Sequence, residues 1–329
     1  MQTTLVKSNG TIDYGLIRSP VDCINFTAFD LQTPMGRPRS AFLKRFLFKQ
    51  FVFMGINAPG ISAGLAVVDL KYAANGFFYV YDRQSGALVE TKKTTVPYAA
   101  SIKPCPENID AVFNTRALRI HVSGDQIRAE SRDMVLDAAM TRETEPLRVC
   151  TKAGCSGWTY TQKTAPIGLA GTLRCNGRQF DLFPDTCKGI TDWTAGYLRR
   201  ETFWNWASAA GVLADGRPFG MNLACGVNET GVTENCFWLD GVQTKVDTVQ
   251  FQFNPRATEE QWRVRSADGK VDLMFSPNAH RSEHLNIMVV ASRFVQFMGT
   301  FSGKVVCDRH GETDITAMPG WTEDHFARW

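Results

Sequence analysis

The sequence predicts a mostly β, antiparallel protein built from two consecutive β-barrel or β-sandwich units. Most apolar segments are short, rich in β-branched and aromatic residues, and bounded by Gly, Asn, Asp or Pro. Capped helical patterns are almost absent, so the crossover helices that parallel strands require are missing. One succession of segments also occurs twice along the chain, which indicates an internal duplication.

The expected strands follow one another at intervals typical of β proteins. Turn signals with Gly after Asp or Ser lie between several of them, at 123–125, 215–216, 240–241 and 267–269. The clearest strand segments are 46–54, 65–70, 76–81, 117–122, 246–253, 262–265, 271–275 and 287–297.

The duplication is visible in three successive segments. The first half contains LKRFLFKQFVF, then SAGLAVVDL, then FFYVYDRQSGAL, and the second half contains YLRRETFWNWASAAG, then FGMNLACGVN, then NCFWLDGVQTKV. Each half presents a basic pair before an aromatic strand, a strand of small residues, and an aromatic strand that ends in Asp. Further along, LRIHVSGDQIRAES is similar to WRVRSADGKVDLMF. We therefore expect a unit at 1–155 and a Trp-rich unit at 156–329, with the boundary in the turn-rich stretch 151–164.

Composition excludes several classes of protein. The chain has 329 residues, 44% of them hydrophobic, with 36 basic and 33 acidic side chains and a net charge of +3. Disordered chains have fewer apolar residues and more net charge, and collagen or coiled-coil chains are periodic. Nucleic acid is a poor partner because binding its phosphates requires concentrated Lys and Arg.

The sequence favours a cytoplasmic protein. The start MQTTLVKSNGTIDYG has no signal-peptide pattern, and no apolar run is long enough to span a membrane. The protein is therefore expected to be soluble, or at most in peripheral contact with a membrane. Nine cysteines without C-x-x-C spacing predict free thiols in a reducing compartment.

Tryptophan is concentrated in the second unit. The first is Trp158, and seven of the eight lie from Trp193 onward. They form either a larger core or an aromatic cavity for apolar or planar ligands. Strand alternation places Trp204 and Trp206 on one face and Asn205 on the other. The two indoles contact a ligand if that face lines a lumen, and are core residues if it packs on the other unit.

Three polar residues, Asn222, Glu234 and Asn235, lie within or just before the two strands that follow the Trp204–Trp206 segment. Asn222 lies among apolar and small residues, so its amide requires partners, either backbone groups or a ligand. Glu234 and Asn235 come just before a strand, and alternation puts Glu234 on the face of Trp238. A carboxyl beside an indole can act as a general acid, whereas pairing with Arg199 or Arg200 would make it structural.

The C-terminal segment holds a second candidate for proton transfer. Glu323, Asp324 and His325 are consecutive and lie between aromatic residues. Such a cluster can shuttle a proton, or it can close the sheet through salt bridges. Lys163 lies where the units are expected to meet, and there it fits an inter-domain ion pair better than a Schiff base.

Signatures of metal and nucleotide sites are weak or missing. His280 to His284 fits H-x-x-E-H, but that motif functions on a helix, and here we expect a solvated turn between strands. The sequence contains no G-x-G-x-x-G after a strand, no P-loop and no G-x-S-x-G. We therefore predict no metal and no cofactor.

Several separated motifs occur in the order found in one family. They are GLIRSPVDCINFTAFDL, VCTKAGCSGWTYTQKTAPIGLAGTL, GITDWTAGYLRRETFWNWA, FGMNLACGV, TENCFWLDG and GWTEDHFARW. On these motifs the chain resembles, over nearly its whole length, a bacterial family known as domain of unknown function 2804. More remotely, the two β units are similar to the tandem lipocalin-like carotenoid hydratases and lipocalin-like cyclases. The resemblance implies a lipocalin-like fold, and fold alone does not determine function.

Three functions fit these observations. The first is binding of a hydrophobic small molecule, such as a lipid or isoprenoid, by Trp204, Trp206, Asn222, Asn235 and Trp238. The second is a cofactor-independent hydratase, isomerase or cyclase that uses Glu234 or the cluster Glu323, Asp324 and His325. The third is a structural or interaction module without a ligand. The sequence leaves the ligand and the oligomeric state open.

Overall fold

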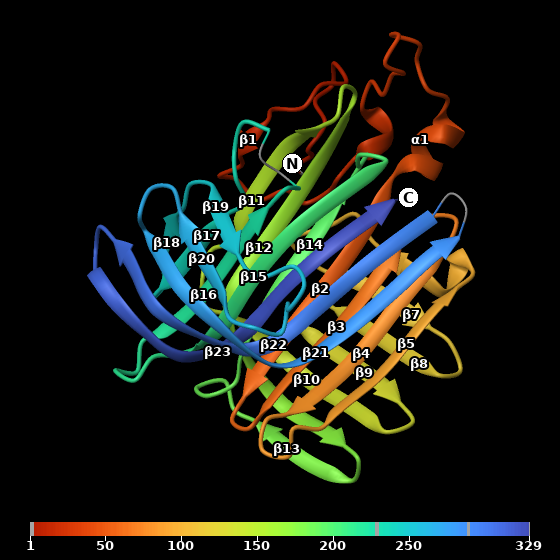
Figure 1. The fold of residues 1–329 in the computed structure, drawn as a ribbon. Coiled ribbons are helices and arrows are strands. Elements are labelled where there is room, and N and C mark those ends of the chain that lie inside the picture. The colour runs from red at the N-terminus through yellow and green to blue at the C-terminus, as the bar shows by residue number, and fades with distance from the viewer. Residues whose placement is uncertain (1–2, 228–229, 288–289, 329) are drawn as a thin grey trace.

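The computed structural model describes residues 3–227, 230–287 and 290–328. Within these residues nearly all regular structure is antiparallel β (Figure 1). The helical segments there are α1 (Ala41–Leu47) and the two 3-10 turns η1 (Phe26–Ala28) and η2 (Pro97–Ala99). The prediction of a mostly β fold with few short helices is confirmed.

The first sheet has 14 strands, all from residues 15–196. They are β1 (Gly15–Leu16), β2 (Lys49–Ala58), β3 (Ile61–Asp69), β4 (Ala74–Asp82), β5 (Leu88–Thr95), β6 (Ala100–Ile102), β7 (Asp110–Asn114), β8 (Leu118–Ser123), β9 (Gln126–Ser131), β10 (Met134–Arg142), β11 (Leu147–Ala153), β12 (Gly157–Cys175), β13 (Arg178–Leu182) and β14 (Lys188–Gly196).

The second sheet has nine strands, all from residues 201–328. They are β15 (Glu201–Val212), β16 (Pro218–Cys225), β17 (Cys236–Leu239), β18 (Val242–Lys245), β19 (Val249–Gln252), β20 (Trp262–Ser266), β21 (Val271–Ile287), β22 (Val290–Cys307) and β23 (Gly311–Arg328).

The two sheets share one topology. The first runs β5-β4-β3-β2-β14-β12-β10-β9-β8 before its last two strands, and the second runs β18-β17-β16-β15-β23-β22-β21-β20-β19. In each, four consecutive strands form a meander whose first strand pairs with the last strand of the unit. Two consecutive antiparallel units are therefore confirmed. The sheets change between residues 196 and 201, whereas the domain boundary after residue 155 stays a prediction.

Two local expectations were wrong. The strand expected at 46–54 begins only at residue 49, because residues 46 and 47 belong to α1, which begins after Ser40, whose Oγ accepts a hydrogen bond from the Leu43 N–H at 3.3 Å. The segment from His280 to His284 is a continuous part of β21 instead of a turn. Pairing with β22 satisfies the backbone groups on one side of this segment, so this polar stretch stays extended.

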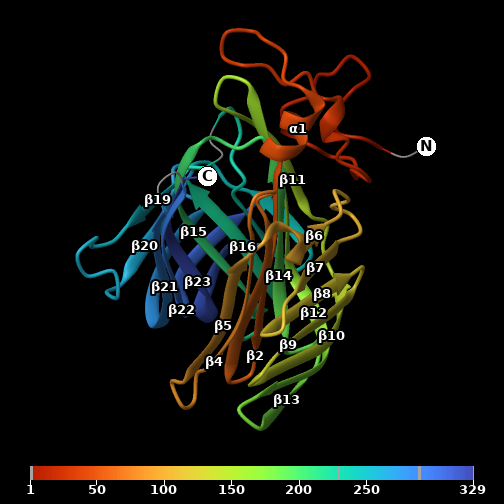
Figure 2. The ribbon, with the colours of Figure 1, turned by 90° about the vertical axis from the view of Figure 1, so that its right-hand side faces the viewer.

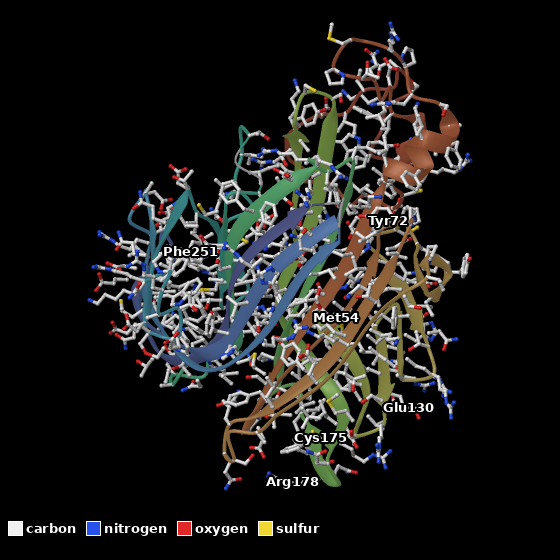
Figure 3. The ribbon with its side chains drawn as sticks, turned by 45° about the vertical axis from the view of Figure 1, so that its right-hand side comes forward. Met54, Tyr72, Glu130, Cys175, Arg178 and Phe251 are labelled. Atoms are coloured by element: carbon white, nitrogen blue, oxygen red, sulfur yellow. The ribbon has the colours of Figure 1, made fainter. Side chains whose placement is uncertain are left out.

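Each sheet curls around its own hydrophobic core, and a third cluster lies between the sheets. The first core contains residues from 5 to 197 and the second contains residues from 207 to 318. Figure 2 shows the two sheets as neighbouring layers, and Figure 3 shows Phe251 on the second sheet, far from Arg178 on the first. The cluster between the layers draws aromatic side chains from both, including Phe53, Tyr79 and Trp321.

Two further observations concern the helices and the cysteines. None of the helices in the described ranges is long and apolar enough to cross a membrane. All nine cysteines lie in those ranges, and each is a free thiol, as the sequence predicts.

Lys49 at the start of β2 predicts a pH dependence of stability. Its ammonium donates to the carbonyls of Phe46 at 2.8 Å and Leu70 at 2.5 Å. Burial lowers its pKa from 10.5 to about 8, with Asp69 opposing and Lys71 adding to the shift. Between these two values the unfolded chain binds more protons than the folded one. The contribution of Lys49 to the free energy of unfolding should therefore rise with pH from about 8 to 10.5.

Urea denaturation at pH 7.5 and pH 10 measures this rise. Wild type should gain stability relative to Lys49→Met between these two pH values, whereas its difference from Lys93→Met, at an exposed position of β5, should stay constant. An unchanged difference between wild type and Lys49→Met would show that Lys49 makes no such contribution.

Candidate functional site

The candidate site begins on the face of the second sheet that packs against the first. In the register of β15 and β23, Trp204 lies opposite His325 and Trp206 lies opposite Glu323. Directly opposed residues share a face, so these four side chains point the same way. Trp206 makes an edge contact with Phe53 of the first sheet, with ring centroids 5.7 Å apart. The predicted shared face of the two indoles is confirmed, and Trp206 packs on the neighbouring unit.

Glu323 is the centre of a hydrogen-bond network on this face. Its Oε1 accepts the Trp204 Nε1–H at 2.9 Å and lies 3.0 Å from His325 Nδ1. Its Oε2 accepts the Gln296 amide at 3.1 Å. The side chains of Glu323 and His325 are only 11% and 17% exposed. The carboxylate therefore holds the imidazole in one orientation, which Trp204 supports with its ring centroid 4.1 Å from that of His325.

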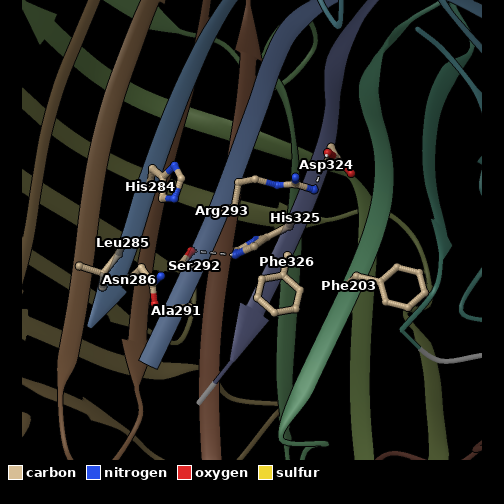
Figure 4. A pocket seen from close by; sticks show the side chains of 10 residues that line it. All are labelled: Phe203, His284, Leu285, Asn286, Ala291, Ser292, Arg293, Asp324, His325 and Phe326. Carbon is tan, nitrogen blue, oxygen red and sulfur yellow. Dashed lines mark hydrogen bonds and ion pairs between the residues drawn. The ribbon is translucent and has the colours of Figure 1, made fainter. Parts of the chain in front are cut away.

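A pocket of about 500 Å³ opens beside His325 (Figure 4). It lies where β15 begins, β21 ends, β22 begins and β23 ends. Ser292 Oγ is 3.2 Å from His325 Nε2, so the imidazole bridges Ser292 and Glu323. The lining residues are Phe203, His284, Leu285, Asn286, Ala291, Ser292, Arg293, Asp324, His325 and Phe326.

Asp324 lines the same pocket but belongs to a different set of contacts. Strand alternation turns it to the opposite face from Glu323 and His325. Its carboxylate accepts the Asn205 amide at 3.0 Å and lies 3.8 Å from the Arg293 guanidinium. The structure therefore brings His325 and Asp324 to the pocket and keeps Glu323 behind the imidazole.

Glu234 lies in a separate, buried ion cluster. Its carboxylate is 3.6 Å from Lys163 Nζ, and Lys163 also pairs with Asp192. All three side chains are at most 10% exposed. Burial lowers the pKa of Lys163, but Asp192 and Glu234 together raise it above its ordinary value. Lys163 belongs to β12 of the first sheet and Glu234 to the segment before β17, so this ion pair connects the first sheet with a segment of the second unit's chain.

The three remaining sequence candidates are hydrogen-bonded within the protein. Asn222 accepts the Trp206 Nε1–H at 2.9 Å and donates to the Glu234 carbonyl at 2.9 Å. Asn235 accepts the Ala224 N–H at 2.6 Å and donates to Asp247. Trp238 donates to the Glu145 carbonyl at 2.9 Å. Hydrogen bonds to other groups of the protein are what we expect if these three side chains stabilise the fold.

Sequence reasoning missed a second polar group between the sheets. Tyr79 Oη, Arg281 Nη1, Gln296 Oε1 and Trp321 Nε1 are buried and make no hydrogen bond within the described part of the chain. Arg281 also pairs with Glu90 at 2.6 Å, and its guanidinium lies 5.0 Å from the Tyr79 ring centroid. Each is 5% exposed or less. Leaving such groups unpaired is costly, so they are positions where a water molecule or a polar ligand atom can bind.

The two polar groups are neighbours. Gln296 donates to Glu323, and Arg281, Gln296 and Glu323 are paired in register across β21, β22 and β23. Only the alternation of each strand is visible in the sequence, and the residues come from segments far apart. A local sequence signal for this arrangement therefore does not exist.

The structure also bears on the metal prediction. Across the described ranges, no three His, Cys, Asp or Glu side chains are grouped so that they could hold a metal ion. His284 lines the pocket, and His280 stacks near Phe297 with ring centroids 5.6 Å apart.

Two curled antiparallel sheets in tandem form a lipocalin-like fold. The chain belongs to the family described as a domain of unknown function, DUF2804, which matches residues 1–329. This confirms the family resemblance and says nothing about the source organism. No curated protein sequence gives a significant match.

Solved structures share the fold at low sequence identity. CghA, crystallised with Sch210972, is 10% identical with a TM-score of 0.58, over 98% of this chain and 97% of its own. Kievitone hydratase from Nectria haematococca is 10% identical with a TM-score of 0.51, over 85% of this chain and 88% of its own. At these identities the likeness shows the fold alone.

Proposed function

We propose that the chain binds a hydrophobic small molecule, of lipid or isoprenoid type, in the pocket beside His325. The pocket itself carries the proposal. Its volume of about 500 Å³ is in the range of small-molecule sites. Phe203, Leu285 and Phe326 offer apolar contact, while Ser292 and His325 offer polar atoms that can orient a ligand.

A second candidate function is a cofactor-independent hydratase, isomerase or cyclase. It is favoured by the Glu323–His325 contact of 3.0 Å at the pocket wall, which can hold or move a proton. One structural neighbour is named as a hydratase, which is compatible with this chemistry. Glu234 is less suited to this role, because it pairs with Lys163 at 3.6 Å and is not among the lining residues of the pocket.

The remaining predictions about partners and compartment are part of this proposal. Nine free thiols support a cytoplasmic location. A net charge of +3 gives no reason to expect a nucleic-acid partner. Peripheral contact with a membrane stays a prediction.

Two phenylalanines of similar exposure provide a matched test of the pocket. Phe203 lines it and is 66% exposed, whereas Phe183 is 63% exposed and is not among its lining residues. We expect Phe203→Asp to weaken binding of the apolar dye N-phenyl-1-naphthylamine at least about tenfold, because a carboxylate would have to be desolvated by the dye. Phe183→Asp should bind as tightly as wild type.

Fluorescence titration measures the affinities, and native mass spectrometry followed by organic extraction identifies any molecule that copurifies. Equal affinities for the two variants, or no saturable binding by wild type, would contradict the proposal. The latter result would favour a structural or interaction module without a ligand.

A further inference from the structure

Ser292, His325 and Glu323 form a continuous hydrogen-bonded series at the pocket. Ser292 Oγ to His325 Nε2 is 3.2 Å, and His325 Nδ1 to Glu323 Oε1 is 3.0 Å. In Figure 4 the Ser292 hydroxyl and the His325 ring point toward each other across neighbouring strands. These are the distances and the order that connect a nucleophile, a general base and the carboxylate that orients the base.

The contacts of Glu323 determine the direction of the hydrogen bonds. Trp204 Nε1 and the Gln296 amide can only donate, so the carboxylate accepts from both. In the tautomer that donates to this carboxylate, the imidazole proton is on Nδ1. Nε2 is then left with a lone pair toward Ser292, as a general base requires. Since Glu323 and His325 are only 11% and 17% exposed, water competes little for these contacts.

We infer that Ser292 is the nucleophile of an acyl-transfer site that hydrolyses esters of apolar acids or alcohols. The inference rests on the proposed function, because the pocket must first bind an apolar molecule.

The reaction consists of two balanced steps. In the first, Ser292 Oγ forms a bond to the ester carbonyl carbon, His325 Nε2 takes the hydroxyl proton, and the C–O bond to the alcohol breaks as His325 returns that proton to the leaving oxygen. In the second, water attacks the acyl-serine, again through His325, and releases the carboxylic acid and free Ser292. Nothing is oxidised or reduced, and water is the sole co-reactant.

The test uses the full-length protein, a fluorophosphonate probe and p-nitrophenyl octanoate. We expect the probe to phosphonylate Ser292, located by peptide mass spectrometry, and Ser292→Ala to lose both labelling and ester hydrolysis. His325→Gln should lower the hydrolysis rate on the order of 10³-fold, and Glu323→Gln at least about 100-fold. The matched control is Ser282→Ala, an exposed serine on β21 outside the pocket, which should retain both.

Each outcome decides the inference. Labelling of Ser292 that depends on His325 supports it. Labelling of another serine, or hydrolysis that is unchanged in Ser292→Ala, overturns it. If Ser292→Ala binds N-phenyl-1-naphthylamine like wild type while the wild-type protein neither reacts with the probe nor cleaves the ester, the acyl-transfer site is excluded and the binding pocket stands.

Discussion

Replacing Lys163 by Met should lower the free energy of unfolding by about 3–5 kcal/mol, the cost of removing one partner from a buried ion pair. Lys163 is 4% exposed and is the shared cation of Asp192 and Glu234. Without it, two carboxylates would remain in a low-dielectric layer where they repel each other. Urea denaturation at pH 7 measures the loss as a lower midpoint with an unchanged slope.

A substitution within the same cluster separates charge from packing. Glu234→Gln is nearly isosteric and leaves the Lys163–Asp192 pair balanced, so it should cost clearly less than Lys163→Met. The exposed pair of Arg119 and Glu130 provides a second comparison, because Arg119→Met should cost less than about 1 kcal/mol. Equal losses for Lys163→Met and Arg119→Met would show that the buried cluster does not stabilise the fold.

Replacing Gly55 by Ala should destabilise the protein by about 1–3 kcal/mol, as overpacking does in a well-packed core. A Cβ at position 55 would lie 2.7 Å from the ring carbon Cη2 of Trp321 and 3.0 Å from Ile190. Gly55 pairs in register with Gly64, where a Cβ would lie 2.5 Å from the Tyr79 hydroxyl. The two glycines thus make room for Tyr79 and for Trp321 of the second sheet.

A double-mutant cycle checks this explanation. Trp321→Phe removes the ring atoms that meet the new methyl group, so Gly55→Ala should cost less in the Trp321→Phe background than in wild type. Strictly additive losses would show that the sheets do not meet through this contact.

The candidate pocket was predictable only in part. Glu323 and His325 are two residues apart on one strand, so their common face follows from local alternation. Ser292 is 33 positions before His325 and reaches it because β22 and β23 pair in one register. A shift of one residue would have turned Ser292 to the other face. The partner of Glu234 could not be predicted from neighbouring residues either, because Lys163 comes from the other sheet.

The sequence by itself determined the mostly β class, the duplicated strand order and the shared face of Trp204 and Trp206. These features depend on residue types and on an alternation that acts over a few neighbouring positions. Only the tertiary structure decided that this face packs on the first sheet, and that four buried polar atoms of Tyr79, Arg281, Gln296 and Trp321 lie there without partners in the described chain. Those outcomes depend on sheet curvature and on many contacts between distant segments, which no single segment encodes.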